Sequence, residues 1–214
     1  SSFLKILNLS FRTLFHKMLK KLSVLLILFL PDFSFSKDPL VNSRVFIENL
    51  GKEVIASVAD ESLDDKIRQE NFRKLYNSAF DNKYISKFVL GRHWKKIDEK
   101  TKKIFFTSFN DYLVMVYAPK FKGWSGSFKT TKSSQIKNNL YLVEMKLVNS
   151  KDSPSLKLDW RMYLNSNNEF KILDVNIDGV SMLVTQRAEF ISVIKNSPDG
   201  VMGLIKKMKI KTNS

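Results

Sequence analysis

The chain has 214 residues, of which 43% are hydrophobic and 27% charged, and its formal net charge is +15. These proportions are those of a globular protein and argue against intrinsic disorder over most of the chain. The absence of cysteine excludes disulfides, thiolate metal sites and cysteine nucleophiles, and the two histidines, His16 and His93, are too few for a multi-histidine metal centre.

The N-terminal segment has the pattern of a secretory signal peptide. A basic stretch, 18–21, precedes an apolar run, 22–30, and small residues then occupy the cleavage positions before Lys37. An apolar run of this length is too short for a membrane-spanning helix, which needs about 20 residues. We therefore expect residues 1–36 to be a signal peptide, with Met18 as a candidate translation start.

The mature chain is expected to be one domain, residues 37–214, which is long enough to bury a core without covalent staples. An exported protein without cysteine fits the bacterial periplasm better than a small disulfide-stapled extracellular scaffold. We therefore predict a periplasmic location.

The first half of this domain has the apolar period of helices. Apolar residues recur every three or four positions from Val41 to about Phe121. Gly91 is a natural end for the third of these helices, Asp98 begins the fourth, and Pro119 limits it. The predicted helices cover about 41–58, 63–79, 82–90 and 98–118.

Beyond Gly123 the apolar period changes from 3.6 to two, which is typical of half-buried strands. A turn at 165–168 separates the last two strands, and two helices then follow at 184–195 and 200–208. This order predicts an α+β fold with N-terminal helices, a twisted antiparallel sheet of four strands and C-terminal helices. The predicted strands cover 124–132, 141–148, 156–164 and 170–177.

Catalytic motifs are absent from the sequence. The segment 123–126, Gly-Trp-Ser-Gly, lacks the spacing of a nucleophile elbow. The carboxylate pairs Asp64–Asp65 and Asp98–Glu99 are adjacent helical residues, which point apart. His93 is the only histidine of the mature chain and more typical of a surface position than of a general base. The sequence therefore indicates a binding protein that is not an enzyme and uses no cofactor and no metal.

The basic excess has two interpretations, which the sequence leaves open. One is compositional bias, because lysine, asparagine, phenylalanine and isoleucine are all abundant. The other is a functional surface for an acidic partner. Only seven of the 36 basic residues are arginines, and the lysine clusters lack the aromatic and arginine interleaving of single-strand binders. We therefore expect no nucleic-acid partner.

Five motifs, in order along the chain, resemble those of the MlaC/toluene-tolerance family. The family patterns are F-x-L-G-R-Y-W, F-x-x-Y-L-x-x-x-Y-A, D-V-x-I-x-G-V-S, R-x-x-F and L-I-x-x-L. The matching segments are 84–94, 105–118, 170–181, 185–190 and 203–208. His93 stands where the family usually has an aromatic residue, and Met208 replaces the final leucine.

The resemblance implies a periplasmic phospholipid-binding carrier, present as a monomer, whose apolar cavity lies between the sheet and the helices. It also implies two membrane partners, an inner-membrane ABC lipid transporter complex and an outer-membrane lipoprotein complex. An isomerase or hydratase similar to the NTF2-like enzymes is the alternative, and it would need acid or base residues inside the cavity. The expected lipid-binding residues are Phe105, Phe109, Leu113, Tyr117, Trp160, Met162, Val180 and Phe190.

Overall fold

A computed structural model describes residues 38–148 and 155–212 of the chain. The predicted signal peptide and residues 149–154, between the predicted strands 141–148 and 156–164, lie outside these described residues. The described residues from Asp38 onward belong to one compact unit. None of their helices is both long enough and apolar enough to span a bilayer.

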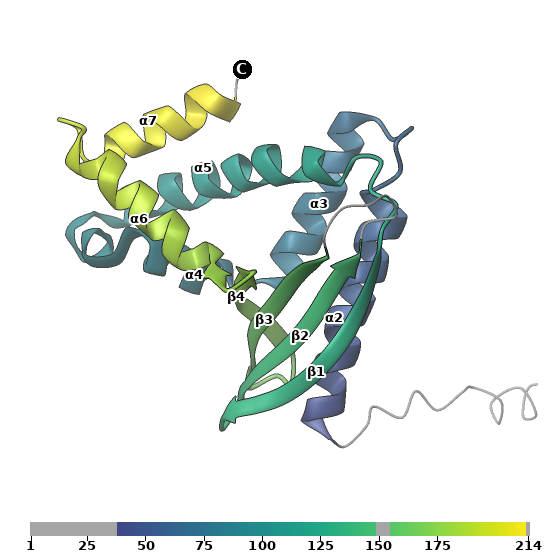
Figure 1. The fold of residues 1–214 in the computed structure, drawn as a ribbon. Coiled ribbons are helices and arrows are strands. Elements are labelled where there is room, and N and C mark those ends of the chain that lie inside the picture. The colour runs from purple at the N-terminus through teal and green to yellow at the C-terminus, as the bar shows by residue number, and fades with distance from the viewer. Residues whose placement is uncertain (1–37, 149–154, 213–214) are drawn as a thin grey trace, which may run out of the picture. The chain divides into compact units, whose positions relative to one another are not determined.

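Helices form the first half of the described chain, as the apolar period indicates (Figure 1). The predicted positions of all four α-helices agree with the structure, and two short 3-10 helices extend the third and the fourth. The elements are α2 (Pro39–Ser57), α3 (Asp65–Ala79), α4 (Asn82–Leu90), η2 (Gly91–Lys96), α5 (Glu99–Tyr117) and η3 (Ala118–Phe121).

Each of these four α-helices begins directly after an aspartate. The carboxylates of Asp38, Asp64, Asp81 and Asp98 accept hydrogen bonds of 2.7 to 2.9 Å from backbone N–H groups of the first turn. Such caps satisfy donors that the helix itself leaves unpaired. Gly91 ends α4 with a φ of +52°, a conformation that glycine adopts without strain.

The second half is an antiparallel sheet in the order β1-β2-β3-β4-β5, followed by two helices. The α+β class is confirmed, but the sheet has five strands where we predicted four. The bounds are β1 (Ser127–Lys137), β2 (Leu140–Val148), β3 (Leu156–Leu164), β4 (Phe170–Ile177), β5 (Val180–Ser181), α6 (Met182–Lys195) and α7 (Val201–Thr212).

The additional strand arises from a tight turn after β4. Asp178 and Gly179 both have positive φ values, +48° and +85°, so the chain reverses at once. Two residues then pair with Asn176 and Ile177 before Ser181 caps α6. The first strand, β1, also begins and ends later than the predicted 124–132.

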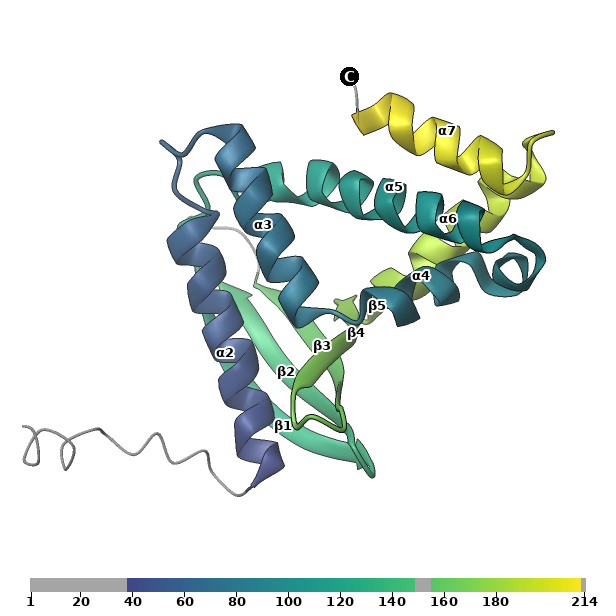
Figure 2. The same cartoon turned by 180° about the vertical axis from the view of Figure 1, so that it is seen from behind.

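Helices cover one face of the sheet. The helix α2 packs across β1 and β2, and the helices α3, α4 and α6 approach β4 (Figure 1). Figure 2 shows the covered face from the helix side, with α2 and α3 in front of the strands. The opposite face of β1, β2 and β3, which we name the outer face, is not covered by any helix of the described residues.

Two hydrophobic clusters result from this arrangement. The sheet cluster lies between the strands and α2 and includes Ile47, Val143 and Met162. The helical cluster lies among α4, α5, α6 and α7 and includes Phe105 and Phe190. The two clusters meet at Phe80, which packs against both, and the candidate site lies in this region.

Candidate functional site

A cavity of about 530 Å³ opens between the covered face of the sheet and the helices. Its volume lies within the range of about 300–1,000 Å³ that is typical of ligand sites. Its walls are almost entirely apolar, and every helix from α2 to α6 and every strand from β1 to β4 contributes to them.

The strand alternation of the sequence produces the sheet wall of the cavity. Side chains of the strands point to one face at every second residue. Those that point toward the helices line the cavity, and β3, the middle strand of the sheet, contributes Leu158 and Trp160. The wall also includes Phe128, Met145, Leu147, Leu156, Leu173, Val175 and Ile177.

The helix wall is made of apolar stripes at helical spacing. On α5 the stripe is Phe109, Leu113 and Tyr117, which follow one another at intervals of four residues. Residues three or four apart share one face of a helix. The corresponding stripes are Ile47, Leu50 and Val54 on α2, Phe72, Leu75 and Tyr76 on α3, and Ile85 and Val89 on α4.

Gly51 allows α2 to lie close to the sheet. A Cβ atom at this position would lie 2.8 Å from the ring of Phe128, closer than real contacts allow. Glycine costs about 1 kcal/mol in a helix relative to alanine, so its presence in the middle of α2 has a packing reason. The ring of Phe128, which lines the cavity, thereby packs directly against α2.

A buried arginine fixes the connection between the two helices of this wall. Arg68 of α3 is fully buried, and its guanidinium donates hydrogen bonds to the backbone carbonyls of Val58, Asp60 and Leu63. Buried charges need such partners. The connection between α2 and α3 therefore has a defined conformation, which sets the separation of these two helices in the cavity wall.

One carboxylate, Asp174, lies on the cavity wall, and its hydrogen bonds are structural. Its Oδ2 accepts a hydrogen bond of 2.6 Å from the hydroxyl of Ser181. Its Oδ1 accepts from the backbone N–H groups of Val175 and Leu183, at 2.8 and 3.0 Å. Asp174 thus ties β4 to the first turn of α6, where a negative charge is favoured by the helix dipole.

A single cation stands among the residues that line the cavity. Lys120 of η3 is exposed to solvent and forms no ion pair or hydrogen bond within residues 38–148 and 155–212. Its neighbour Lys122, in contrast, pairs with Asp65 at 3.2 Å. An exposed side chain on a cavity wall marks a place where the wall meets solvent, so Lys120 lies at the mouth.

Two tyrosines of the wall remain uncharged. Burial raises the pKa of Tyr76 above its ordinary value of 10. Burial also raises the pKa of Tyr117, and the nearby Tyr112 and Glu189 add to this effect. Desolvation disfavours the ionised form of such groups. At neutral pH both tyrosines are therefore uncharged members of the cavity wall.

The structure separates the eight predicted site residues into two sets. Phe109, Leu113, Tyr117 and Trp160 line the cavity. The other four lie elsewhere: Phe105 in the helical cluster, Met162 in the sheet cluster, Phe190 between α5 and α7, and Val180 on β5, where 54% of its surface is exposed.

Sequence reasoning missed the contributions of α2 and α3 to the cavity. The stripes on these helices were recognised as helical periodicity but not as cavity walls, although Phe72 and Tyr76 are large aromatic residues at i and i+4. Phe128 and Phe121 were also missed. The available signal was that aromatic residues lie near the ends of three elements, α3, η3 and β1. That they converge on one cavity depends on the fold.

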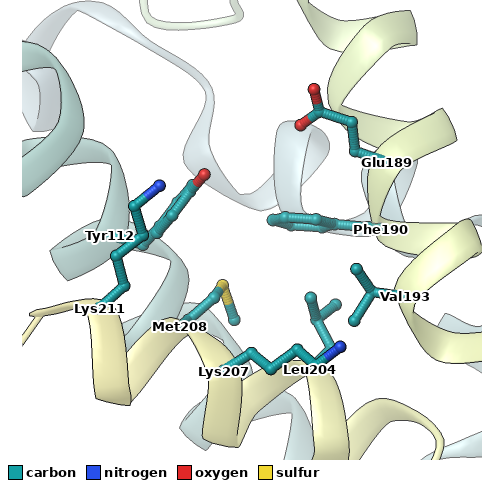
Figure 3. Close-up of a pocket in the computed structure, with 8 residues that line it drawn as sticks. All are labelled: Tyr112, Glu189, Phe190, Val193, Leu204, Lys207, Met208 and Lys211. Atoms are coloured by element: carbon teal, nitrogen blue, oxygen red, sulfur yellow. The ribbon is translucent and has the colours of Figure 1, made fainter. Parts of the chain in front are cut away.

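A second, smaller pocket of about 170 Å³ lies between α5, α6 and α7. Figure 3 shows its lining, with Tyr112 and Lys211 on one side and Phe190 and Val193 on the other. Its volume falls below the range of about 300–1,000 Å³ for ligand sites. The large cavity is therefore the candidate functional site.

His93 lies on η2 and does not line the large cavity. Burial lowers its pKa, and the positive charges of Arg92, Lys96 and Lys195 lower it further. Within residues 38–148 and 155–212, no group of three or more histidine, aspartate or glutamate side chains is placed to hold a metal ion.

Comparisons with known proteins agree with this geometry. The family model for the MlaC protein matches residues 48–210. A solved structure of a phospholipid-binding protein from Ralstonia solanacearum, described in complex with a phospholipid, has 18% sequence identity and a TM-score of 0.65. The alignment covers 79% of this chain and 96% of that chain, and likeness at this identity shows a shared fold. The search of curated proteins found no match.

Proposed function

The chain belongs to the MlaC family, which its match over residues 48–210 establishes, and on this premise we propose that it is a phospholipid carrier. The observation that supports this function best is the apolar cavity of about 530 Å³ between the sheet and the helices. The acyl chains of the lipid lie in this cavity, against Trp160 and Leu158 on the sheet side and Phe109 and Leu113 on the helix side.

The energetics of lipid transfer explain the need for such a protein. The two acyl chains of a phospholipid contain about 30 methylene groups, and each costs about 0.8 kcal/mol in water. Spontaneous transfer through an aqueous compartment is therefore opposed by on the order of 20 kcal/mol. An apolar cavity removes this cost because the chains exchange a bilayer for another apolar environment.

The polar part of the lipid remains at the cavity mouth. Lys120, the cation on the wall, is exposed and without an ion pair among the described residues, so it can approach the lipid phosphate. Tyr117 lies one turn earlier, at the end of α5, and also lines the cavity. A phosphate in solvent contact keeps its hydration, whereas burial of the charge would be costly.

The carrier works in the periplasm, after removal of the signal peptide 1–36. It exchanges lipid with an inner-membrane ABC transporter complex and with an outer-membrane lipoprotein complex. These partners and this location follow from the family resemblance, and the predicted export signal supports the location. The lipid-binding domain is the mature chain, 37–214.

The alternative, an NTF2-like isomerase or hydratase, has one observation in its favour, the buried carboxylate of Asp174 on the cavity wall. Its oxygens already accept hydrogen bonds from Ser181, Val175 and Leu183. A general base needs a free position toward its substrate. These contacts favour a role as a helix cap, and a binding protein is the better proposal.

Mass spectrometry of lipid that co-purifies with the protein tests the proposed function. We expect the unmodified chain to carry phospholipid. The double substitution Leu158→Glu/Trp160→Glu places two charges on the sheet wall, where the acyl chains lie, and should abolish lipid loading. The substitution Ile210→Glu on α7 is the control, because this side chain is 71% exposed and its helix contributes no residue to the cavity walls.

Circular dichroism spectra of the three proteins must agree before the lipid contents are compared. An unmodified protein that purifies without lipid, and that takes up none from phospholipid vesicles, would refute the proposal. A double variant that remains folded with unchanged lipid content would refute the placement of the acyl chains.

A further inference from the structure

Three lysines stand directly opposite one another on adjacent strands of the sheet. Lys129 of β1 is paired in register with Lys146 of β2, and Lys146 is paired with Lys157 of β3. We name these three residues the lysine row. Opposite residues on neighbouring antiparallel strands share a face and are about 5 Å apart at Cα, so their like charges destabilise the sheet.

Because their strand neighbours line the cavity, the three lysines point to the outer face of the sheet. No described helix covers this face (Figure 1). All three side chains are exposed. Lys157 has carboxylates nearby, with Glu144 at 3.7 Å and Asp159 at 3.4 Å from its Nζ. Lys129 and Lys146 form no ion pair within residues 38–148 and 155–212, so two of the three charges lack a partner there.

The lysine row lies directly behind the cavity wall. Each of its lysines is flanked in sequence by residues that line the cavity, because successive side chains of a strand alternate between the two faces. These flanking residues are Phe128, Met145, Leu147, Leu156 and Leu158. A surface bound to the lysine row is therefore one strand thickness away from the site that holds the proposed lipid.

We propose that the lysine row is a docking surface for an anionic phospholipid membrane, a proposal that rests on the lipid-carrier function. The row matches a membrane in charge, because its positive charges meet the negative charges of the lipid phosphates. It contains no arginine, the residue suited to bidentate contacts with protein carboxylates, and lysine is a mobile point charge. Val148, two residues from Lys146 on the same face and 44% exposed, supplies an apolar contact.

The expected strength of this contact fits a carrier that must also leave the membrane. One lysine near an anionic membrane surface increases affinity by a factor of about five, and the gain disappears beyond the screening length of the salt. Three lysines therefore give a contact that is weak and readily reversed.

Sedimentation of the purified protein with vesicles tests this proposal. One vesicle contains phosphatidylcholine alone, and the other contains equal parts of phosphatidylcholine and phosphatidylglycerol. We expect the protein to bind the anionic vesicle preferentially, and salt to weaken this binding. The double substitution Lys129→Gln/Lys146→Gln should reduce the binding by about 25-fold, a factor of about five for each lysine.

The control is Lys100→Gln/Lys103→Gln on α5, which removes the same charge from two exposed lysines outside the sheet. It should bind vesicles within about twofold of the unmodified protein, because distant charges are screened. Equal losses in the two double variants would overturn the proposal, since net charge alone would then explain binding. Retention of an acidic polypeptide such as polyglutamate, without preference for the anionic vesicle, would also overturn it and indicate a protein partner.

Failure of this proposal is distinguishable from failure of the carrier function. The lysine-row variant should retain its co-purified lipid, since neither side chain lines the cavity. A protein that carries lipid but ignores the charge of the vesicle remains a carrier and lacks this docking surface.

Discussion

The helical cluster and the cavity contain the same kinds of side chain and differ in how closely these pack. In the helical cluster the rings of Phe105, Phe109 and Phe190 lie 5.2 to 6.1 Å apart, as aromatic rings in a close-packed core do. Around Trp160 and Phe128, in contrast, apolar side chains from the sheet and the helices surround an open space of about 530 Å³.

The layers explain this difference. Helices α5, α6 and α7 lie against one another, and their side chains interdigitate. The twisted sheet meets α2 along β1 and β2 and meets α3 near β4, so its central part is left without a helix in direct contact. Aromatic abundance alone therefore identifies neither a core nor a cavity.

The largest expected effect distinguishes the close-packed region from the open one. Phe105→Ala removes a fully buried ring and should lower the free energy of unfolding by about 3–5 kcal/mol. Leu50 on α2 faces the cavity, so one side of its side chain already lacks partner atoms. Leu50→Ala should therefore lower the free energy of unfolding by only about 1–2 kcal/mol. Denaturant unfolding of lipid-free protein measures both, and equal losses would contradict the contrast.

Most of the fold is predictable because its signals are local. The capping residues Asp64 and Asp98, the end of α4 at Gly91 and the alternation in β2 and β3 each depend on a few neighbouring residues. The two-residue strand β5 was not predicted, because two paired residues after the Asp178–Gly179 turn are too few to show an alternating pattern.

The cavity lining is less predictable because it depends on where layers separate. Phe105 and Phe109 lie four residues apart on α5 and look equivalent in sequence. Phe105 is fully buried in the helical cluster, whereas Phe109 also faces the cavity. The difference reflects the position along α5 at which its contacts change from α7 to α3, which no local pattern encodes.

The junction between the cavity wall and the helical cluster is expected to depend on Asp174, which ties β4 to the first turn of α6. Asp174→Asn keeps the shape of the side chain but removes the charge that accepts hydrogen bonds from Ser181 and Leu183. Loss of such a cap costs about 0.5–2 kcal/mol. The melting temperature should fall while lipid loading persists. Thr185→Val near the start of α6 is the control, because it also removes one hydrogen bond, from the Thr185 hydroxyl to the Ser181 carbonyl, at a residue that does not line the cavity. Loss of loading without loss of stability would instead assign Asp174 to the ligand.

A smaller effect is expected at the mouth of the cavity. Lys120→Gln should weaken the preference for phospholipid over diacylglycerol by about two- to fivefold, because an exposed ion pair contributes up to about 1 kcal/mol. Competitive loading followed by mass spectrometry measures this ratio. Lys122→Gln is the matched control, since Lys122 already pairs with Asp65. An unchanged ratio in the Lys120 variant would place the lipid phosphate elsewhere.

The smallest effect concerns pH and belongs to the helical region. Burial and three nearby basic residues lower the pKa of His93 below its ordinary value of 6.5 in the folded protein. The unfolded chain therefore takes up this proton first as the pH falls. Above about pH 6.5 His93 is neutral in both states and does not reduce the free energy of unfolding. Below that pH the free energy of unfolding declines, because protonation of His93 favours the unfolded chain.

Other groups act in a different pH range, which makes this effect separable. Four carboxylates have pKa values below their ordinary ones, which are 4.5 for Glu48 and 3.8 for Asp60, Asp65 and Asp98. Their contributions to the free energy of unfolding are therefore lost only in stronger acid. Between about pH 7 and 5 the melting temperature should therefore fall slightly. His93→Gln should flatten this slope without a change in lipid loading, because His93 does not line the cavity. An identical slope in the variant would show that another group causes the decline.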